Sequence, residues 1–571
     1  MSFQPSRTET IKTLFHGNRF IIPAYQRKYS WKFDQRKALW DDIGENLTMK
    51  HFIGTLCFKK VENSTDVFSD VYEIIDGQQR TTTLFILLNV LIEKITSDEL
   101  KNGFINLYIG SKETPKLASL GVDQDFLNNV IFDFTSIMED KLIVRSQINL
   151  YEAKKDFIGL CSKFSQKDIV DWITFISTNI EILIFNVTHQ AEAVKMFSVI
   201  NDRGLPLSNL DKTKSLLMLY STLYLNEEIN EEINTKFGDI FDSFDEMVFL
   251  KNKLSLFRTL DDYDFENTFY THYYYTAKWL FPDWDYQLGA DNIFKQLKKL
   301  CEESKTNVVD LRWNIEEYVR DFHGFALAYV ALLRKVDQDK NYQKYFLYME
   351  FAATLYPLLV RLHEQKKLDG LLRIIEVVEM RVYKLKNTNP RRNMYFLSSN
   401  IIEEEWTIEE IETELTNFVN NFCNDYFTEQ YLLDQVDNKT SLVRYTLYKQ
   451  NLETHGQDLT LDEFRNLQVE HIFSVSPNFA IKQYGFGKHE TYNLEIAKIG
   501  NLTILEKAIN KDVNNMAPTD KLSGYQKSKI NLNSNLMGNL NKFNKEEIAN
   551  RTNEIIEFFM SEFYITEETT S

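Results

Sequence analysis

Two side chains capable of acid–base chemistry stand side by side in the sequence LQVEHIFS, near the C-terminal end of this 571-residue chain. Glu470 and His471 close a segment whose composition predicts a β-strand, and Asn501 and Asn510 follow within KIGNLTILEKAIN. A histidine can act as a general base near neutral pH, because its ordinary pKa is about 6.5. Oxygen ligands from Glu470 and an asparagine suit Mg²⁺ or Mn²⁺. The set predicts metal-assisted hydrolysis of a phosphodiester. A neutral core pairing of Glu470 with His471 is the alternative.

A second motif, DGQQR, begins at Asp76. It follows a predicted strand, Val71 to Ile75, and precedes the strongly helical sequence TTTLFILLNVLIEKI. The backbone N–H groups and the positive end of such a helix favour phosphate binding. Gly77 permits the tight turn, Arg80 can bind phosphate oxygens, and Asp76 can hold a metal ion or position water. A simple turn between a strand and a helix is the alternative interpretation.

Two further segments carry polar side chains at predicted breaks. In IIPAYQRKYSW, Pro23 fixes an extended backbone conformation, and Gln26 and Arg27 follow it. In AEAVKMFSVINDRGLPLSNLDKTKSLL, a helical pattern breaks and then resumes at a Ser208/Asp211 capping box. That break presents Asn201 and Arg203, with Lys214 one turn beyond Asp211. A plain helical hairpin would give the same pattern.

The amino-acid composition of the chain excludes several classes of protein. The net charge of −18 argues against a protein that coats nucleic acid with its whole surface. Residues 1–60 are nonetheless locally basic, and residues 498–529 contain six lysines against three acidic residues. The four cysteines form no CxxC pair, which favours a reducing, cytoplasmic setting without a zinc knuckle or disulfide framework. No apolar run is long enough to span a bilayer, so we expect no membrane association.

The length predicts several domains rather than one core. We expect boundaries at 1–225, 226–430 and 431–571, with a mostly helical middle region. Within it, FENTFYTHYYYTAKWLFPD is dense in aromatic residues, which more often form a core than a surface that stacks on exposed bases. His272 and His323 are likewise expected to be packed or hydrogen-bonded rather than metal ligands.

Several motifs resemble one known family. The N-terminal part resembles the DGQQR domain of GmrSD-type, modification-dependent (type IV) restriction systems in four ordered segments: IPAYQRKYSW, GTLCF, IIDGQQRTTTLF and FSVINDRGLPLSNLDKTKSLL. The C-terminal VEHI and IGNLTIL resemble the HNH (His-Me finger) nuclease domain of the same proteins. The chain departs from the family where EHI is usually followed by Leu-Pro-Gln. Here it reads EHIFSVSPN, with Pro477 displaced, which puts the geometry of that loop in doubt.

The resemblance implies a multidomain, mostly helical α+β fold. It would comprise a ParB/sulfiredoxin-like N-terminal domain, the helical middle and a ββα-metal nuclease domain. It implies that the first domain binds, and often hydrolyses, a nucleoside triphosphate, GTP or ATP. The residues implied in nucleotide contact are Gln26, Arg27, Asp76, Gly77, Gln78, Gln79 and Arg80, with Asn201, Arg203 and Lys214 as second contributors. In the nuclease domain it implies His471 as base, Glu470 and Asn510 as metal ligands, and Asn501 as the residue that orients His471.

The sequence therefore predicts a nucleotide-regulated, metal-dependent DNA endonuclease of phage defence that cuts modified DNA. Its expected partners are DNA and a nucleoside triphosphate, and a homodimer is left open. Two alternatives remain. One is a ParB-like, nucleotide-dependent DNA-binding switch whose nuclease region is degenerate. The other is an RNA-directed or indiscriminate toxin nuclease.

Overall fold

The chain is described by a computed structural model in two compact units. The first comprises residues 1–271 and 280–330, and the second comprises residues 272–279 and 331–571. The residues that the structure describes are 7–23, 26–45, 47, 49–61, 66, 69–120, 124–139, 142, 144–187, 208–403, 405–435 and 440–565.

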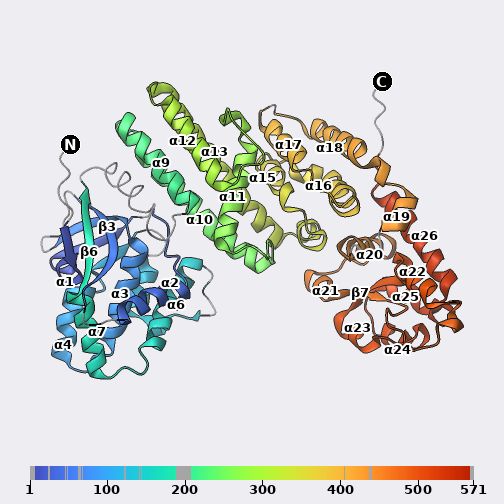
Figure 1. The fold of residues 1–571 in the computed structure, drawn as a ribbon, viewed down its shortest axis with the longest axis horizontal. Helices are drawn as coiled ribbons and strands as arrows, with labels where there is room; N and C mark the ends of the chain where they lie inside the picture. The colour runs from blue at the N-terminus through green and yellow to red at the C-terminus, as the bar shows by residue number, and fades with distance from the viewer. Residues whose placement is uncertain are drawn as a thin grey trace. The chain divides into compact units, whose positions relative to one another are not determined.

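A mixed sheet forms the centre of the N-terminal part of the first unit (Figure 1). Among the described residues its strand order is β1-β6-β3-β4-β2-β5. The pairs β1/β6 and β3/β4 are antiparallel, whereas β6/β3, β4/β2 and β2/β5 are parallel. The strands are β1 (Arg7–Thr10), β2 (Asn18–Ile22), β3 (His51–Lys60), β4 (Asp70–Asp76), β5 (Leu117–Ser119) and β6 (Ile180–Val187).

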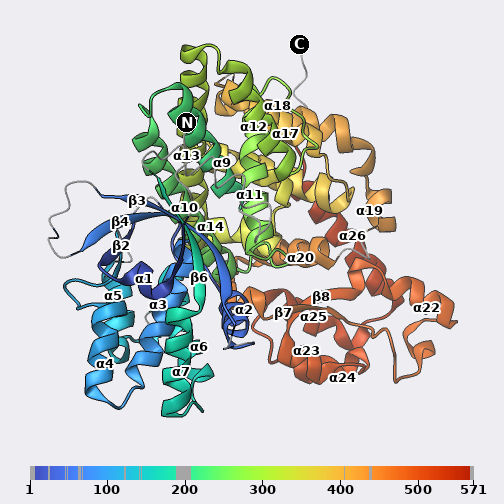
Figure 2. The same cartoon turned by 60° about the vertical axis from the view of Figure 1, so that its left-hand side comes forward.

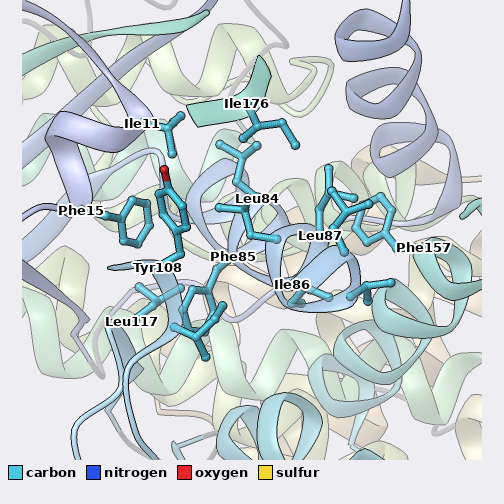
Figure 3. Close-up of a cluster of buried hydrophobic side chains, with 14 of the residues drawn as sticks. Ile11, Phe15, Leu84, Phe85, Ile86, Leu87, Tyr108, Leu117, Phe157 and Ile176 are labelled. Atoms are coloured by element: carbon cyan, nitrogen blue, oxygen red, sulfur yellow. The ribbon is translucent and has the colours of Figure 1, made fainter. Parts of the chain in front are cut away.

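Helices pack against this sheet, and Figure 2 shows α3, α4 and α7 on the same side of it. Their bounds are α1 (Ile11–Phe15), α2 (Phe33–Gly44), α3 (Gln78–Glu93), α4 (Asp98–Phe104), α5 (Gln124–Phe132), α6 (Arg145–Leu160) and α7 (Gln166–Thr178). Together with the strands they enclose one hydrophobic core, in which Ile11, Leu84, Tyr108, Phe157 and Ile176 come from different elements (Figure 3).

Helix α3 is buried along most of its length. Every residue from Thr81 to Ile92 is buried, so this helix has no solvent-facing side over three turns. A helix held on all sides cannot tilt without disturbing the core, because protein interiors are close-packed. The DGQQR turn at its N-terminal end is therefore fixed in position.

Helices make up the described chain that follows. These are α9 (Asn209–Tyr224), α10 (Asn230–Leu254), α11 (Asp262–Thr276), α12 (Ala290–Ser304) and α13 (Val308–Gln338). The aromatic stretch of α11 is core: Phe265, Phe269, Tyr270 and Tyr274 are all fully buried. These rings are therefore not available to stack on an exposed base, as the core interpretation of this stretch predicts.

The second unit is also mostly helical and contains a two-stranded antiparallel sheet, β7 (Leu467–His471) with β8 (Leu502–Glu506). Its helices are α14 (Lys340–Gln343), α15 (Tyr356–Glu364), α16 (Leu368–Val378), α17 (Arg391–Glu403), α18 (Ile408–Cys423), α19 (Glu429–Gln435), α20 (Thr440–His455), α21 (Leu461–Arg465), α22 (His489–Ile496), α23 (Lys507–Val513), α24 (Pro518–Tyr525), α25 (Asn531–Asn539) and α26 (Lys545–Glu562). A separate core beside the small sheet includes Phe473, Tyr492, Leu505, Tyr525 and Ile548.

Two general expectations can be compared with the structure. No helix in the described part of the chain is both long and apolar enough to cross a membrane. All four cysteines, Cys57, Cys161, Cys301 and Cys423, are buried free thiols. The mostly helical α+β architecture expected from the sequence is confirmed at this coarse level.

Candidate functional site

The C-terminal candidate site is built on a strand, a strand and a helix. In the antiparallel pair, Glu470 lies opposite Thr503 and His471 lies opposite Leu502. Helix α23 follows β8 without a break, and Figure 2 shows it beside the two strands. The strand predicted to end at Glu470 and His471 is confirmed, and GNLTIL, which the resemblance implies to be the second strand, forms β8 from Leu502 onwards. The same resemblance implies that the helix opens at Asn510. The helix begins at Lys507, three residues earlier than the predicted start at Asn510.

Glu470 has a buried cationic partner that the sequence did not suggest. The Lys521 Nζ atom lies 2.5 Å from Glu470 Oε1 and 2.7 Å from the carbonyl oxygen of His471. Glu470 is buried and the Lys521 side chain is fully buried. Burial raises the pKa of the Glu470 carboxyl, and the adjacent ammonium opposes that rise. One carboxylate oxygen is thereby held in place by the lysine.

His471 is half-buried at the end of β7. Burial lowers the pKa of its imidazole, and the neighbouring Lys521 ammonium lowers it further. Both effects favour the neutral ring, which is the form that can accept a proton. The backbone carbonyl of His471 also accepts from Lys521, which ties this end of the strand to helix α24.

Asn501, which the resemblance implies to orient His471, makes no hydrogen bond to the His471 ring. Its Nδ2 donates to the carbonyl oxygens of Phe473 (3.0 Å) and Ile496 (2.9 Å), and its Oδ1 accepts from the Phe473 N–H (2.7 Å). These bonds use both amide hydrogens and the carbonyl oxygen. Asn501 therefore fixes the backbone immediately after His471, and its influence on the imidazole is indirect. The physical reason is that this buried loop needs partners for its own backbone groups.

Asn510 is the fourth residue of α23, and its Nδ2 donates to Gln468 Oε1 over 3.0 Å. Its own Oδ1 makes no hydrogen bond within the described residues, whereas the Glu470 carboxylate also accepts from the backbone N–H of His471. The described residues contain no cluster of three or more His, Cys, Asp and Glu side chains that could cage a metal. Two protein oxygens nevertheless fit Mg²⁺ or Mn²⁺, which keep several waters and take further oxygens from a phosphate substrate. Lys521, already bound to Glu470, is the feature that opposes this fit.

Helix α26 supports the turn that carries Asn501. Gly500 lies against it so closely that a β-carbon there would be 2.1 Å from the Ile548 carbonyl oxygen and 2.4 Å from Thr552 Oγ1. Arg551 donates to the carbonyl oxygens of Gly500 and Leu502, on both sides of Asn501. Lys521 and Arg551 are the residues that sequence reasoning missed. Both lie in polar helical segments whose sequence resembles solvent-exposed surface. The one signal in the sequence is the helical spacing of Lys521 from Tyr525, which is buried.

At the N-terminal candidate site, β4 runs into the DGQQR turn. Gly77 has φ +91°, and a β-carbon there would lie 2.0 Å from Leu56 Cδ2, so only glycine fits. Asp76 lies opposite Cys57 of β3. Burial raises the pKa of Asp76 to about 6, against the Gly77 N–H bond and the Arg80 guanidinium, which lower it.

Arg80 points towards β3. Its guanidinium donates to the Thr55 carbonyl oxygen over 3.1 Å, and it covers Gly54 so closely that a β-carbon there would lie 2.8 Å from its Nη1. Burial lowers the pKa of Arg80, and Asp76 opposes this. Asp76 and Arg80 are close enough for each charge to influence the pKa of the other.

The two glutamines of the motif hold the segment that follows Pro23. Gln78 Nε2 donates to the Arg27 carbonyl oxygen (2.5 Å), and the Gln79 amide donates to the Lys28 carbonyl (2.9 Å) and accepts from the Ser30 N–H (2.8 Å). Gln26 Nε2 donates in turn to the carbonyl of Ile75 (3.1 Å). The structure therefore brings the two predicted motifs together.

A cavity of about 360 Å³ opens beside this junction. Polar side chains on its wall come from both motifs and from α10: Gln26, Arg27, Lys28, Gln78, Gln79, Asp239 and Asp242. Its apolar wall includes Ile22, Leu120, Leu127 and Leu150. The Oε1 atom of Gln78 is buried here without a hydrogen-bond partner, so it is free to accept from a bound molecule. Asp76, Gly77, Arg80 and Lys214 do not line the cavity.

Arg27 is committed to acidic partners. Its guanidinium lies 3.3 Å from Asp211 and 3.2 Å from Glu266. Ser208 caps α9: its Oγ accepts from the Asp211 N–H (3.1 Å) and donates to the Asp211 carboxylate (2.7 Å), so the predicted helix start is confirmed, without the reciprocal backbone bond of a capping box. Burial lowers the pKa of Lys214 to about 7. The predicted contacts Asn201 and Arg203 lie outside the described residues.

Comparison with known families agrees with this division of the chain into two candidate sites. Residues 11–218 match the family model for the N-terminal domain of the GmrSD restriction endonuclease. Residues 421–558 match the model for the C-terminal domain of GmrSD restriction endonucleases. No curated protein matches the chain. Because both family domains occur in order and each contains one of the sites, the chain belongs to the GmrSD restriction endonucleases.

Proposed function

We propose that this chain is a nucleotide-regulated, metal-dependent DNA endonuclease of the HNH (His-Me finger) type, which defends against phage by cutting modified DNA. The observation that carries the proposal is the arrangement of β7, β8 and α23, which presents Glu470, His471 and Asn510 within the match to the GmrSD C-terminal domain. This geometry supports phosphodiester hydrolysis, since it supplies a base and two oxygen ligands.

Each residue of this set has a proposed task. His471 accepts the proton of the attacking water at a ring nitrogen, and its lowered pKa keeps that nitrogen available. Glu470 and Asn510 would hold Mg²⁺ or Mn²⁺ through carboxylate and amide oxygens. When bound, such an ion polarises the phosphate and stabilises the leaving oxygen. Asn501 keeps the backbone after His471 in a single conformation through its three hydrogen bonds.

The N-terminal domain is proposed to have a ParB/sulfiredoxin-like core and to bind GTP or ATP. The cavity supports this proposal, because its polar side combines Arg27 and Lys28 with the unpartnered Gln78 Oε1, and its other side is apolar. The polar side of the cavity suits the triphosphate, and the apolar side suits the base. Asp76 and Arg80, next to the cavity lining, are proposed to position water or metal for hydrolysis of the nucleotide.

A second candidate function is favoured by the Lys521 contact. If the ammonium keeps Glu470 from binding metal, the C-terminal domain would serve as a DNA-binding dock and the protein as a nucleotide-dependent switch. The same contact is compatible with catalysis if it only orients the carboxylate. Cleavage measurements distinguish the two functions.

The decisive experiment compares the parent with His471→Ala and with His489→Ala, which removes an exposed histidine at the start of α22. Each protein is incubated with Mg²⁺ or Mn²⁺ and with unmodified, hydroxymethylated or glucosylated DNA, or RNA. We expect cleavage of modified DNA by the parent and by His489→Ala, and at least about a hundredfold less by His471→Ala. Equal cleavage by all three would rule out the assigned base, and preferential cleavage of RNA would support a toxin nuclease.

The nucleotide arm uses Asp76→Asn, which keeps the size of the side chain, with Asp133→Asn as the control. Asp133 pairs with Lys112 on the surface, away from the cavity lining. We expect GTP or ATP turnover to fall for Asp76→Asn and to persist for Asp133→Asn. If the parent hydrolysed none of the four nucleoside triphosphates, the role of the domain would be limited to nucleotide sensing.

A further inference from the structure

The lysines that follow Ile496 differ sharply in their surroundings. Lys498 pairs with Glu495 over 2.8 Å, and Lys521 is buried against Glu470. The remaining lysines up to residue 529 are exposed, and none of them has an ion-pair partner within the described residues: Lys507, Lys511, Lys527 and Lys529. We refer to these four residues as the lysine face.

Two members of the lysine face lie on the same helix as the proposed metal ligand. Residues separated by three or four positions lie side by side on a helix, so Lys507 lies next to both Asn510 and Lys511 on α23. Val513 is buried and lies three positions after Asn510, on the side of Asn510 that faces away from Lys507. Asp512 lies about 100° further round the helix axis than Lys511 and so faces away from Asn510. The exposed side next to Asn510 is therefore basic.

The other two members are held next to the start of the same helix. Glu506, the last residue of β8, accepts from Ser528 Oγ (2.8 Å) and from the Lys529 N–H (2.7 Å). This places the segment that carries Lys527 and Lys529 beside Lys507. Both oxygens of Glu506 are used in these bonds, so the carboxylate is engaged locally.

We propose that the lysine face binds the phosphate backbone of duplex DNA and seats the duplex against the Glu470, His471 and Asn510 site. The inference rests on the proposed function, in which DNA is the substrate. A chain with a net charge of −18 repels DNA over most of its surface, so binding needs a local region of uncompensated positive charge. Lysine contacts to phosphate position a duplex without reading its sequence, which suits an enzyme that selects DNA by other means.

The test measures binding without cleavage. Full-length parent protein and the variant Lys507→Gln/Lys511→Gln/Lys527→Gln are titrated into a fluorescent DNA duplex in EDTA between 50 and 200 mM salt. Each lost phosphate contact should reduce the slope of log K against log salt by about 0.9, or about 2.7 for all three. The loss of affinity across this salt range should accordingly be about 40-fold smaller for the variant than for the parent.

The control is Lys163→Gln/Lys167→Gln/Lys298→Gln, which removes three exposed lysines of the first unit that also have no ion-pair partner in the described chain. It should keep the parental slope. An unchanged slope in the lysine-face variant, or no binding of duplex DNA by the parent at 50 mM salt, would overturn the inference. Metal-dependent cleavage is measured separately. If the parent cleaves DNA but the lysine-face variant keeps the parental slope, the inference about the lysine face is wrong and the endonuclease assignment remains. If the slope falls in the variant but the parent does not cleave, the lysine face is a DNA-binding surface and the endonuclease assignment is wrong.

Discussion

The Glu470 carboxylate and the Lys521 ammonium form a buried pair 2.5 Å apart beside the proposed base. Both charges lose hydration there, and each compensates the other. A buried pair of this kind contributes little net stability compared with an apolar replacement, but it fixes the direction of the carboxylate. We interpret Lys521 as a positioning residue, because it also binds the carbonyl of His471 and so connects the Glu470 carboxylate to the backbone of the proposed base.

This interpretation predicts an asymmetry between single and double substitutions. Lys521→Met should reduce the free energy of unfolding by about 3–5 kcal/mol, because Glu470 remains buried without its cation. The double variant Lys521→Met/Glu470→Leu should recover most of that loss, since no unpaired charge remains. Urea unfolding of the parent, both single variants and the double variant measures the coupling. If the losses of stability in the two single variants simply added in the double variant, the interaction between the two buried charges would be contradicted.

The sequence identified individual site residues where the motif itself contains the chemistry, and it failed where the partner comes from elsewhere. Glu470, His471 and the DGQQR turn could be recognised because adjacent residues supply acid, base and turn. Lys521 could not, because it lies 51 residues from Glu470 and its burial depends on tertiary packing. The hydrogen-bond partners of Asn501 could not be predicted for the same reason, since its amide is used by the backbone of a loop.

At the scale of elements, the proposed nuclease site depends on the packing of α26 against the 3-10 turn Ile499–Asn501. Gly500 lies too close to α26 to leave room for a β-carbon, and Arg551 binds the carbonyl groups on both sides of Asn501. The strand at VEHI was predicted from its composition, and the second strand, at GNLTIL, was implied by the resemblance. The contribution of α26 was not predicted, because an amphipathic helical pattern shows which side is apolar but not which turn it will cover.

We predict that Gly500→Ala weakens this contact. The added methyl group would meet the Ile548 carbonyl oxygen at 2.1 Å, and neither that backbone nor Thr552 can withdraw easily. We expect a loss of about 1–3 kcal/mol or more in stability, because overpacking forces the backbone apart, together with reduced cleavage. Thermal unfolding and the cleavage assay measure the two effects.

Gly538→Ala is the matched control. Gly538 lies in helix α25, and a β-carbon there would have no neighbour within 4 Å. Alanine is favoured over glycine in a helix by roughly 0.5–1 kcal/mol, so this variant should be unchanged or slightly more stable. If both variants behaved alike, close contact at Gly500 would not be the cause.

At the scale of the whole molecule, the ends of the chain carry the motifs and the helical region between them carries none. Residues 11–218 and 421–558 match the two family domains, and both candidate sites lie within these matches. The helices between them could be predicted as helices, since their apolar periodicity is strong. Their packing and buried polar groups could not, because helical periodicity does not specify which helices become neighbours.

One of these buried groups predicts how stability should depend on pH. His272 is 3% exposed in the second unit, where its ring stacks on Tyr356 with centroids 6.2 Å apart. Burial lowers the pKa of its imidazole from 6.5 to about 3. The unfolded chain therefore binds this proton below pH 6.5, while the folded chain remains neutral there until the pH approaches 3. Stability should fall as the pH is lowered through this window, because the unfolded state binds more protons.

This group alone should make the parent roughly 2 kcal/mol less stable at pH 5 than at pH 7.5. His272→Gln removes the titrating ring but keeps a polar side chain, so the variant should lose about that much less stability between the two pH values. Urea unfolding of both proteins at each pH gives the difference directly, and the values at pH 7.5 separate any packing cost of the substitution from the proton effect. Parallel losses in the two proteins would mean that His272 does not remain neutral in the folded state. A smaller loss in the variant would identify this histidine as one source of acid sensitivity in the second unit, independent of the charges at either candidate site.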